Sequence, residues 1–294
     1  MRELVILSGK GGTGKTSLTA AFASFSSDMI LCDADVDAAD LHLLMAPDIQ
    51  QKTDFQGGNE AIINPDKCTR CGLCIELCRF DAVKSTFEID PIECEGCGVC
   101  YDLCPEKAID FPVTTCGEWY ISDTRFGPMV HARLGIAQEN SGRLVALVRQ
   151  EARKIVQKNK IDLILTDGPP GIGCPVIASM GQANAILIVA EPTISGIHDL
   201  ARLAQLAAHF KIPAIVCVNK YDLNLDQTKA IKDLAKEKNI TFAGVIPFDK
   251  NFTESMIQGK NIIETYENSQ ASIAVRKIWE KVMAQPAMNI ERLI

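Results

Sequence analysis

Short apolar runs, each long enough for one buried strand, recur along the chain and alternate with longer segments of helical character. The apolar runs lie at residues 4–7, 29–32, 161–166, 185–190, 214–218 and 242–246. The helical segments lie at 15–25, 140–158, 196–209 and 270–283. Buried strands that alternate with helices are typical of a mostly parallel sheet covered by helices on both faces. The pattern therefore predicts an α/β fold with a doubly wound sheet.

This alternation stops in one part of the chain. Residues 50–60 are polar, contain glycine and have no apolar period, so we expect a boundary there. A cysteine-rich segment follows at 61–113, with short strands predicted at 62–63 and 108–111. From 114 the earlier pattern returns, with a predicted strand at 119–122 and a predicted loop at 125–131. The sequence thus indicates one discontinuous domain, 1–60 with 114–294, interrupted by an insert at 61–113.

The first strand leads into a glycine-rich segment that is typical of phosphate binding. Gly9, Gly14, Lys15 and Thr16 satisfy the pattern G-x-x-x-x-G-K-T. In such loops backbone N–H groups and a helix N-terminus surround phosphate oxygens, while the lysine reaches the β- and γ-phosphates and the hydroxyl ligates Mg²⁺. A glycine turn that merely contains lysine is the alternative, which the flanking strand and helix disfavour. The residues expected to bind the nucleotide are Gly11, Gly12, Thr13, Gly14, Lys15, Thr16 and Ser17.

Acidic residues follow two of the predicted strands. Asp33, Asp35 and Asp37 come after the second strand, and Asp167 precedes a Gly/Pro loop after the strand at 161–166. Carboxylates at the ends of parallel strands suit Mg²⁺ binding and the positioning of water. For Asp37 a helix cap or a solvated turn is an equally good interpretation.

Eight of the twelve cysteines form two blocks with the same spacing, C-x-x-C-x-x-C-x-x-x-C. This is the spacing of bacterial two-cluster ferredoxins, in which the fourth cysteine of each block ligates the other cluster. The resemblance implies two [4Fe–4S] clusters. One set would be Cys68, Cys71, Cys74 and Cys104, and the other Cys94, Cys97, Cys100 and Cys78. Zinc is the alternative for C-x-x-C pairs, and the repeated triple spacing disfavours it. Cys104 precedes the proline of the pattern, whereas Cys78 precedes Arg79.

A second lysine in the glycine-rich loop, Lys10, completes the deviant motif K-G-G-x-G-K-T. Here the chain resembles the superfamily of MinD, ParA, Mrp and the nitrogenase iron protein. That resemblance implies an ATP-dependent homodimer in which Lys10 reaches the partner's nucleotide. It also implies that Asp35 orients the attacking water, that Asp33 lies nearer the Mg²⁺, and that Asp167 acts on the metal through water.

The same resemblance suggests three further site residues. Asn219, at a strand end, and Pro247 match positions that border adenine. Cys174 matches a cysteine that bridges a cluster across the nitrogenase iron protein dimer, so it is a candidate for a bridging site, with a buried structural thiol as the alternative. Cys32, Cys116 and Cys217 are expected to be structural.

Composition limits the partners. The formal net charge of −7 disfavours nucleic-acid binding, and no apolar run is long enough to span a membrane. An apolar stripe of Val275, Ile278, Trp279 and Val282 lies on the last predicted helix, and we expect it in the core rather than on a membrane. The chain starts directly with a strand and its cysteines indicate metal rather than disulfides, which favours the cytoplasm.

The sequence predicts ATP binding and hydrolysis with Lys10, Lys15, Asp35 and Asp167 as catalytic residues. Nucleotide-driven switching of a dimer would be coupled to electron transfer through the two clusters. An iron–sulfur carrier or assembly ATPase and a redox-sensing regulatory ATPase are the alternatives. The expected partners are a second copy of the chain and a redox or iron–sulfur client protein.

Overall fold

The computed structural model describes residues 1–135 and 140–289 and divides into two compact units. The first comprises Met1–Lys52, Tyr120–Ala132 and the chain from Ser141 onward. The second comprises Thr53–Trp119 with Arg133–Asn140. The cysteine-rich insert at 61–113 lies within the second unit.

In the described part of the chain, nine strands form one sheet in the order β11-β10-β9-β1-β8-β2-β7-β6-β3. Pairings of β1 with β8 and β9, of β10 with β9 and β11, and of β2 with β7 and β8 are all parallel. The mostly parallel α/β fold is therefore confirmed. The strands are β1 Arg2–Ser8, β2 Met29–Asp33, β3 Asp48–Asn59, β6 Val113–Thr124, β7 Gly127–Leu134, β8 Leu163–Pro170, β9 Ala185–Ala190, β10 Ala214–Asn219 and β11 Thr241–Ile246.

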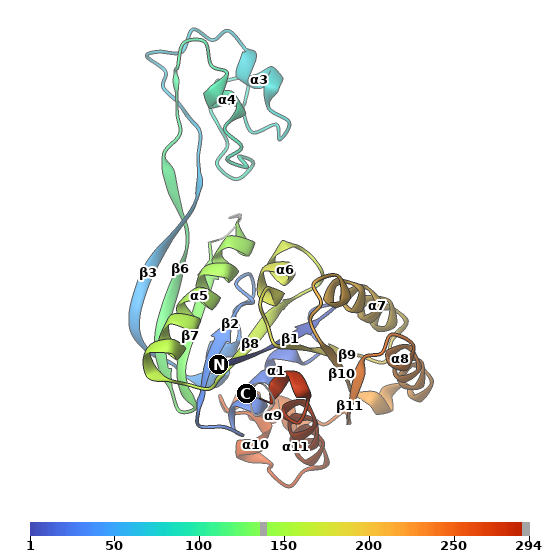
Figure 1. Cartoon of the computed structure of the whole chain (residues 1–294). Helices are drawn as coiled ribbons and strands as arrows, with labels where there is room; N and C mark the ends of the chain where they lie inside the picture. Colours follow the sequence, from blue (N-terminus) through green and yellow to red (C-terminus); the bar gives the residue numbers. More distant parts are fainter. Residues whose placement is uncertain (136–139, 290–294) are drawn as a thin grey trace. The chain divides into compact units, whose positions relative to one another are not determined.

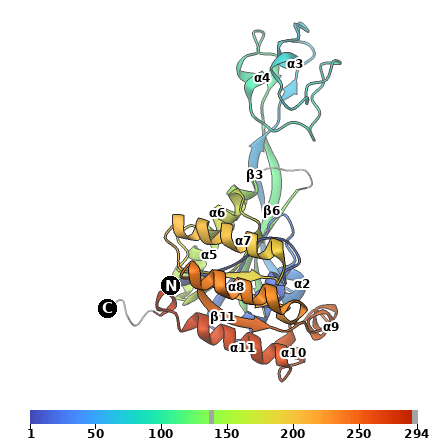
Figure 2. The ribbon, with the colours of Figure 1, turned by 90° about the vertical axis from the view of Figure 1, so that its right-hand side faces the viewer.

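Helices cover both faces of this sheet (Figures 1 and 2). Side chains alternate along β1, so Leu4 and Ile6 enter one apolar cluster while Val5 and Leu7 enter another. The first cluster includes residues of α1 and α11, and the second includes residues of α6, α7 and α8. The helices of this unit are α1 Lys15–Ala23, α2 Leu41–Met45, α5 Ser141–Asn159, α6 Cys174–Met180, α7 Ile194–His209, α8 Leu225–Glu237, α9 Asn251–Ile257, α10 Ile262–Thr265 and α11 Gln270–Met283, with short 3-10 turns at Tyr221–Leu223 and Pro286–Met288.

The apolar stripe of α11 lies in the core, as predicted. Val275, Ile278, Trp279 and Val282 are at most 8% exposed. The Trp279 ring packs on that of Phe22 in α1, with 5.1 Å between ring centroids. This face of the helix is therefore occupied by the protein's own interior.

Two segments have more regular structure than predicted. Residues 50–60, where a boundary was expected, include the change of unit between Lys52 and Thr53, but most of them lie in β3. The prediction of a loop at 125–131 was wrong, because β7 already begins at Gly127. β3 is the last strand of the sheet and is mostly exposed, so it lacks the apolar residues by which strands are recognised. In β7, Gly127 has φ +122° and lies against the Met29 carbonyl oxygen, where a side chain would collide. Arg125 and Phe126 alone form the turn between β6 and β7.

The second unit has little regular structure of its own. β4 (Ile62–Ile63) pairs antiparallel with β5 (Ile109–Asp110), close to the predicted short strands. Two short helices, α3 (Leu73–Leu77) and α4 (Val99–Asp102), each include the third cysteine of a block. β3 and β6 each begin in one unit and end in the other.

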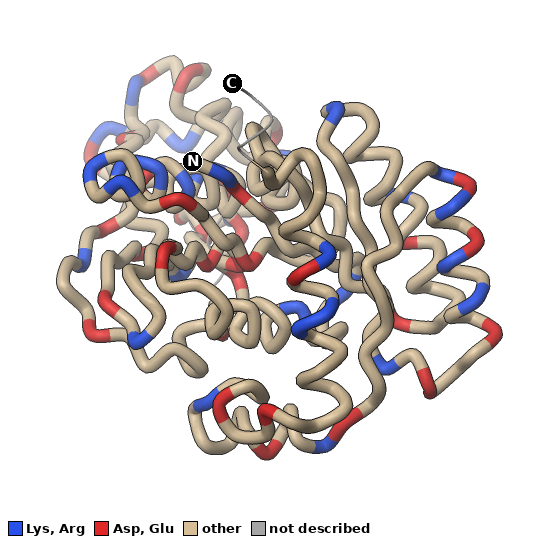
Figure 3. The backbone as a smooth tube through the Cα atoms, turned by 60° about the horizontal axis from the view of Figure 1, so that its bottom comes forward, with Lys and Arg blue, Asp and Glu red and all other residues tan. Residues whose placement is uncertain are grey.

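Charged positions of both signs are interspersed along the chain. In the view of Figure 3, blue lysine and arginine positions and red aspartate and glutamate positions lie in all parts of the tube. Among the described residues, no helix is both long and apolar enough to cross a membrane.

Candidate nucleotide and cluster sites

The glycine-rich loop lies between β1 and α1, at the carboxyl end of the sheet's central strands. Gly12 and Gly14 have φ of +78° and +87°, which favours glycine at both positions. A side chain at Gly14 would also lie 2.4 Å from the Asn219 amide nitrogen. The loop borders a cavity of about 520 Å³, within the range of small-ligand sites. Gly11, Gly12, Thr13, Gly14, Lys15, Thr16 and Ser17 all line it.

Lys15 lies among the predicted acidic residues. Its ammonium is 3.0 Å from Asp167 Oδ1 and 3.3 Å from Asp35 Oδ2. Asp33, Asp35 and Asp167 are all at most 7% exposed. The fold thus brings together residues that are more than 130 positions apart in sequence. Asp37, by contrast, is exposed.

Burial and the neighbouring charges shift the pKa values of Asp33, Asp35 and Lys15. Burial raises the pKa of Asp33 well above its ordinary value, and Asp167 adds to this. Burial likewise raises the pKa of Asp35 to about 6, against the opposing effect of Lys15. Burial alone would lower the pKa of Lys15, but Asp167, Asp35 and Asp33 together raise it. Excess negative charge in a water-poor pocket suits the binding of a divalent cation.

Two threonine hydroxyls hold Asp167. Thr16 Oγ1 donates to Asp167 Oδ2 at 2.7 Å, and Thr19 Oγ1 lies 2.8 Å from Asp167 Oδ1. Sequence analysis included Thr16 but missed Thr19, which stands outside the glycine-rich motif. Its spacing of four residues from Lys15, one helical turn, was the available signal. Thr13, also buried, has a hydroxyl for which the described residues provide no hydrogen-bond partner.

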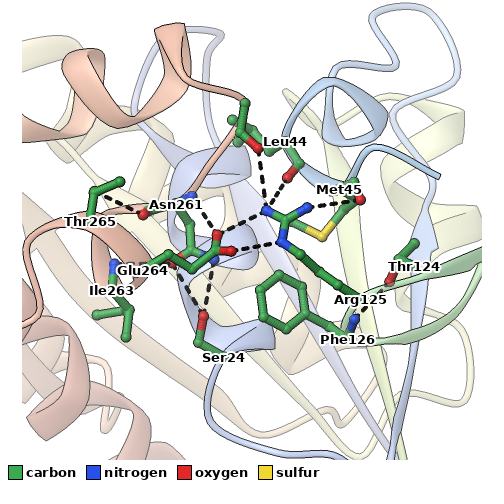
Figure 4. Close-up of polar contacts among 11 residues, drawn as sticks. Ser24, Leu44, Met45, Thr124, Arg125, Phe126, Asn261, Ile263, Glu264 and Thr265 are labelled. Carbon is green, nitrogen blue, oxygen red and sulfur yellow. Dashed lines mark hydrogen bonds and ion pairs between the residues drawn. The ribbon is translucent and has the colours of Figure 1, made fainter.

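The segment that follows Asp35 contains α2, and this helix is held by hydrogen bonds at its start and at its end. The Leu41 N–H, at the start of α2, donates to Asp33 Oδ2 at 3.2 Å. At the other end, Arg125 donates to the Leu44 and Met45 carbonyls at 2.7 and 2.9 Å and forms a two-pronged ion pair with Glu264 (Figure 4). Since Leu44 lines the nucleotide cavity, Arg125 fixes one of its walls. The predicted loop at 125–131 gave no reason to expect this role.

Lys10 does not point freely into solvent in this structure. Its ammonium lies 3.0 Å from Glu191 Oε2, and Lys220 lies 2.6 Å from the other oxygen of Glu191. Burial alone would raise the pKa of Glu191, but Lys220 and Lys10 lower it. Lys220 also donates to the Gly12 carbonyl at 3.1 Å. Glu191 therefore joins both lysines next to the glycine-rich loop.

Asn219 contacts the loop itself. Its Nδ2 donates to the Thr13 carbonyl at 2.8 Å and its Oδ1 accepts from the Lys220 N–H at 3.0 Å. Asn219 also lines the cavity. Pro247 lines the same cavity, together with Phe248, Phe252 and Met256. The apolar side chains at this end suit a nucleobase better than a phosphate.

The eight insert cysteines line two cavities. Cys68, Cys71, Cys74 and Cys104 line one, among leucines and isoleucines, and Cys78, Cys94, Cys97 and Cys100 line the other, beside Phe80 and Phe111. Cys100 borders both cavities. The first cavity thus includes the four cysteines of one predicted set together with Cys100, and the second includes the four of the other predicted set. Thiols around an apolar space fit the donor set of a [4Fe–4S] cluster. In residues 1–135 and 140–289, no three His, Cys, Asp or Glu side chains are grouped tightly enough for a single metal ion.

The remaining cysteines differ in exposure. Cys174 is exposed at the start of α6, so it is not a buried packing residue. Cys32, Cys116 and Cys217 are buried, in keeping with a structural role. Burial raises the pKa of Cys217 to about 12, which keeps it a thiol.

Comparison with known proteins identifies the family. The family of CobQ/CobB/MinD/ParA nucleotide-binding domains (CbiA) matches residues 4–262. The chain belongs to this family. An uncharacterized protein of Methanocaldococcus jannaschii is 31% identical over 289 residues, which cover 95% of this chain and 96% of that protein. CbiA-family membership supports an ATP-hydrolysing P-loop enzyme of the MinD/ParA type.

Two further proteins are similar to this chain in fold or in part of the sequence. The septum site-determining protein MinD of Pyrococcus horikoshii, solved with Mg-ADP, has a TM-score of 0.60 at 19% identity and covers 96% of this chain and 95% of its own. This likeness concerns the fold. The cytosolic Fe-S cluster assembly factor nubp2 of Xenopus tropicalis is 24% identical over 158 residues, 48% of this CbiA-family chain and 58% of that protein.

Proposed function

We propose that this CbiA-family protein binds and hydrolyses ATP as a homodimer and couples that cycle to electron transfer through two [4Fe–4S] clusters in its insert. One observation carries the proposal. A single chain combines the buried group of Lys15, Asp33, Asp35 and Asp167 with two cavities lined by the eight insert cysteines, five at one cavity and four at the other, because Cys100 borders both.

The nucleotide site supplies the residues that hydrolysis needs. Gly11 to Ser17 would surround the phosphates, Thr16 and Asp33 would hold Mg²⁺, and Asp167 would support the metal. Mg²⁺ neutralises charge on the phosphates when bound. Asp35 would orient the attacking water, and Lys10 would leave Glu191 to reach the nucleotide of a second copy. Asn219 and Pro247 would border the adenine.

The insert supplies the ligands for the clusters. Cys68, Cys71, Cys74 and Cys104 would hold one cluster, and Cys94, Cys97, Cys100 and Cys78 the other. A bound [4Fe–4S] cluster provides a one-electron redox centre. Its reduction potential depends on hydrogen bonds to the sulfur atoms and on solvent exposure. The Ala108 N–H already points at Cys104 Sγ, 3.3 Å away. Cys174, exposed in the monomer, is the candidate for a further site shared by two copies.

The test is anaerobic reconstitution followed by redox titration with and without Mg-ATP. We expect about eight iron atoms per chain, and a shift of either cluster's potential by tens of millivolts when Mg-ATP binds. Intact clusters with unshifted potentials in an active ATPase would refute the coupling. Failure to retain any iron would refute the cluster sites.

A second function is favoured by one comparison, the likeness to a cytosolic Fe-S cluster assembly factor. A carrier would transfer iron and sulfide to an apo-protein, whereas an electron donor would keep them. Incubation of the iron-loaded protein with an apo-ferredoxin, followed by separation and iron analysis, distinguishes the two. A redox partner or cluster client is proposed in both cases.

A further inference from the structure

Thr19 is a buried polar residue that the proposed mechanism has not used. It lies in the middle of α1, is 0% exposed, and has no place in the phosphate-binding motif. Its hydroxyl lies 2.8 Å from Asp167 Oδ1 and 3.0 Å from the Lys15 carbonyl oxygen. A single side chain thus contacts both the metal-supporting carboxylate and the residue that carries the phosphate-binding ammonium.

The Thr19 hydroxyl has only one proton to donate. The Lys15 carbonyl is four residues earlier in the same helix, so helix geometry already offers it the Thr19 backbone N–H. Asp167 Oδ1 is the closer acceptor, and a carboxylate accepts more strongly than a neutral carbonyl. The proton therefore belongs on the bond to Asp167.

Asp167 uses its two oxygens differently. Oδ2 accepts from Thr16, whereas Oδ1 is shared between the Thr19 hydroxyl and the Lys15 ammonium, 3.0 Å away. When Lys15 turns to a phosphate, Thr19 is the remaining donor to Oδ1 among these contacts. A buried carboxylate with an unpaired oxygen is unfavourable and is free to rotate.

We infer that Thr19 is a positioning residue that holds Asp167 in the orientation needed for the metal of the nucleotide site. The inference rests on the proposed ATPase function and deepens it. Thr19 is fully buried and is not among the residues that line the nucleotide cavity, so it would act through Asp167. Its contribution is to keep the carboxylate fixed after Lys15 has moved to the phosphates.

The test compares Thr19→Val, which keeps the shape and removes the hydroxyl, with Thr19→Ser, which keeps the hydroxyl. Ser272→Ala is the matched control, since Ser272 is equally buried and its hydroxyl donates to the Tyr266 carbonyl at 2.7 Å. Ser272 is far from Thr19 in the sequence. For each full-length protein we would measure melting temperature, the Mg²⁺ dependence of ATP hydrolysis, the KM for ATP at saturating Mg²⁺, and Mn²⁺ binding in the presence of ATP by electron paramagnetic resonance.

We expect Thr19→Val to weaken the binding of Mg²⁺ and of Mn²⁺ roughly tenfold or more, because that factor corresponds to the loss of one hydrogen bond to a charged group. The KM for ATP should change less than about twofold. Thr19→Ser should restore metal affinity to within about threefold of wild type, and Ser272→Ala should leave it unchanged. Should Thr19→Val fail to fold, Thr19→Ala takes its place with the same expectation.

Three results would overturn the inference: metal affinity of the hydroxyl-free variant within twofold of wild type, a Thr19→Ser variant as impaired as Thr19→Val, or an equal loss in Ser272→Ala. These leave the proposed ATPase intact. A wild-type protein that binds neither ATP nor Mn²⁺ would instead overturn the proposed function, and this inference with it.

Discussion

The three buried carboxylates predict that Asp35, a proposed catalytic residue, destabilises the protein when neither metal nor nucleotide is bound. Asparagine at position 35 resembles protonated aspartate in shape, so Asp35→Asn removes the charge and little else. The pKa of Asp35 is raised from 3.8 to about 6, mainly by burial. A difference of two pKa units corresponds to about 3 kcal/mol. We therefore expect Asp35→Asn to be more stable than wild type by about 3 kcal/mol at pH 7.5 without metal or nucleotide.

The pH dependence of stability shows when the variant should be more stable than wild type. In the unfolded chain Asp35 loses its proton near pH 4, whereas in the folded protein it keeps the proton until about pH 6. Folding takes up a proton between these values, so wild-type stability falls as the pH rises through them. The Asp35→Asn variant has no carboxyl group at this position, so its stability does not fall for this reason. The advantage of the variant should be close to zero at pH 4 and complete above pH 7.

The assay is thermal melting of both proteins in EDTA from pH 4 to pH 8. For a domain of this size, about 3 kcal/mol corresponds to a rise of roughly 5 °C or more. Asp226→Asn, a change at an exposed residue of α8, controls for simple loss of negative charge and should have little effect. An equal difference at pH 4 and pH 7.5, or a lower melting temperature for Asp35→Asn at pH 7.5, would refute the electrostatic reasoning.

Three further predictions concern other parts of the molecule. Gly14→Ala should abolish binding of a fluorescent ATP analogue while the protein stays folded, because φ is +87° and a side chain would lie 2.4 Å from Asn219; binding within threefold of wild type would contradict this. Cys78→Ser and Cys104→Ser should each lower iron from about eight to about four atoms per reconstituted chain, with Cys78→Ser losing the cluster of Cys94, Cys97 and Cys100; loss of the same cluster in both variants would disprove the crossed ligand sets. Arg125→Ala should lower stability by about 1–3 kcal/mol in thermal melts, since it removes the hydrogen bonds to the Leu44 and Met45 carbonyls and the ion pair with Glu264. Arg276→Ala, which breaks an exposed pair with Glu267, should cost less than about 1 kcal/mol.

Much of the fold followed from local pattern, and the failures have local causes. The apolar runs of β1, β8, β9 and β10 are buried on both faces, so their sequence alone identifies them as central strands of a parallel sheet. β3 escaped recognition because an edge strand with mostly exposed residues needs no apolar period. β7 was missed because its first residues, Gly127 and Pro128, are typical of turns.

The candidate sites show the same division. Motif spacing brought attention to Lys15, Thr16 and the insert cysteines, since their chemistry depends on residues close in sequence. Thr19, Glu191 and Arg125 act through partners that are distant in the chain: Asp167, Lys10 and the end of α2. Such pairings depend on the order of strands in the sheet, which local periodicity does not determine.

The insert lies between β3 and β6, and this position determines how the insert could be exchanged or removed. These strands are neighbours in the sheet, so the chain leaves the ATPase unit and returns to it on adjacent strands. A tight turn between them would close the same gap, because the hydrogen-bonding of neighbouring strands already brings the two ends together. We therefore expect the cysteine-rich segment to be replaceable as a unit. Its removal, or its exchange for another metal-binding module, should leave the apolar cores on either side of β1 packed as they are, because no residue of 61–113 belongs to them.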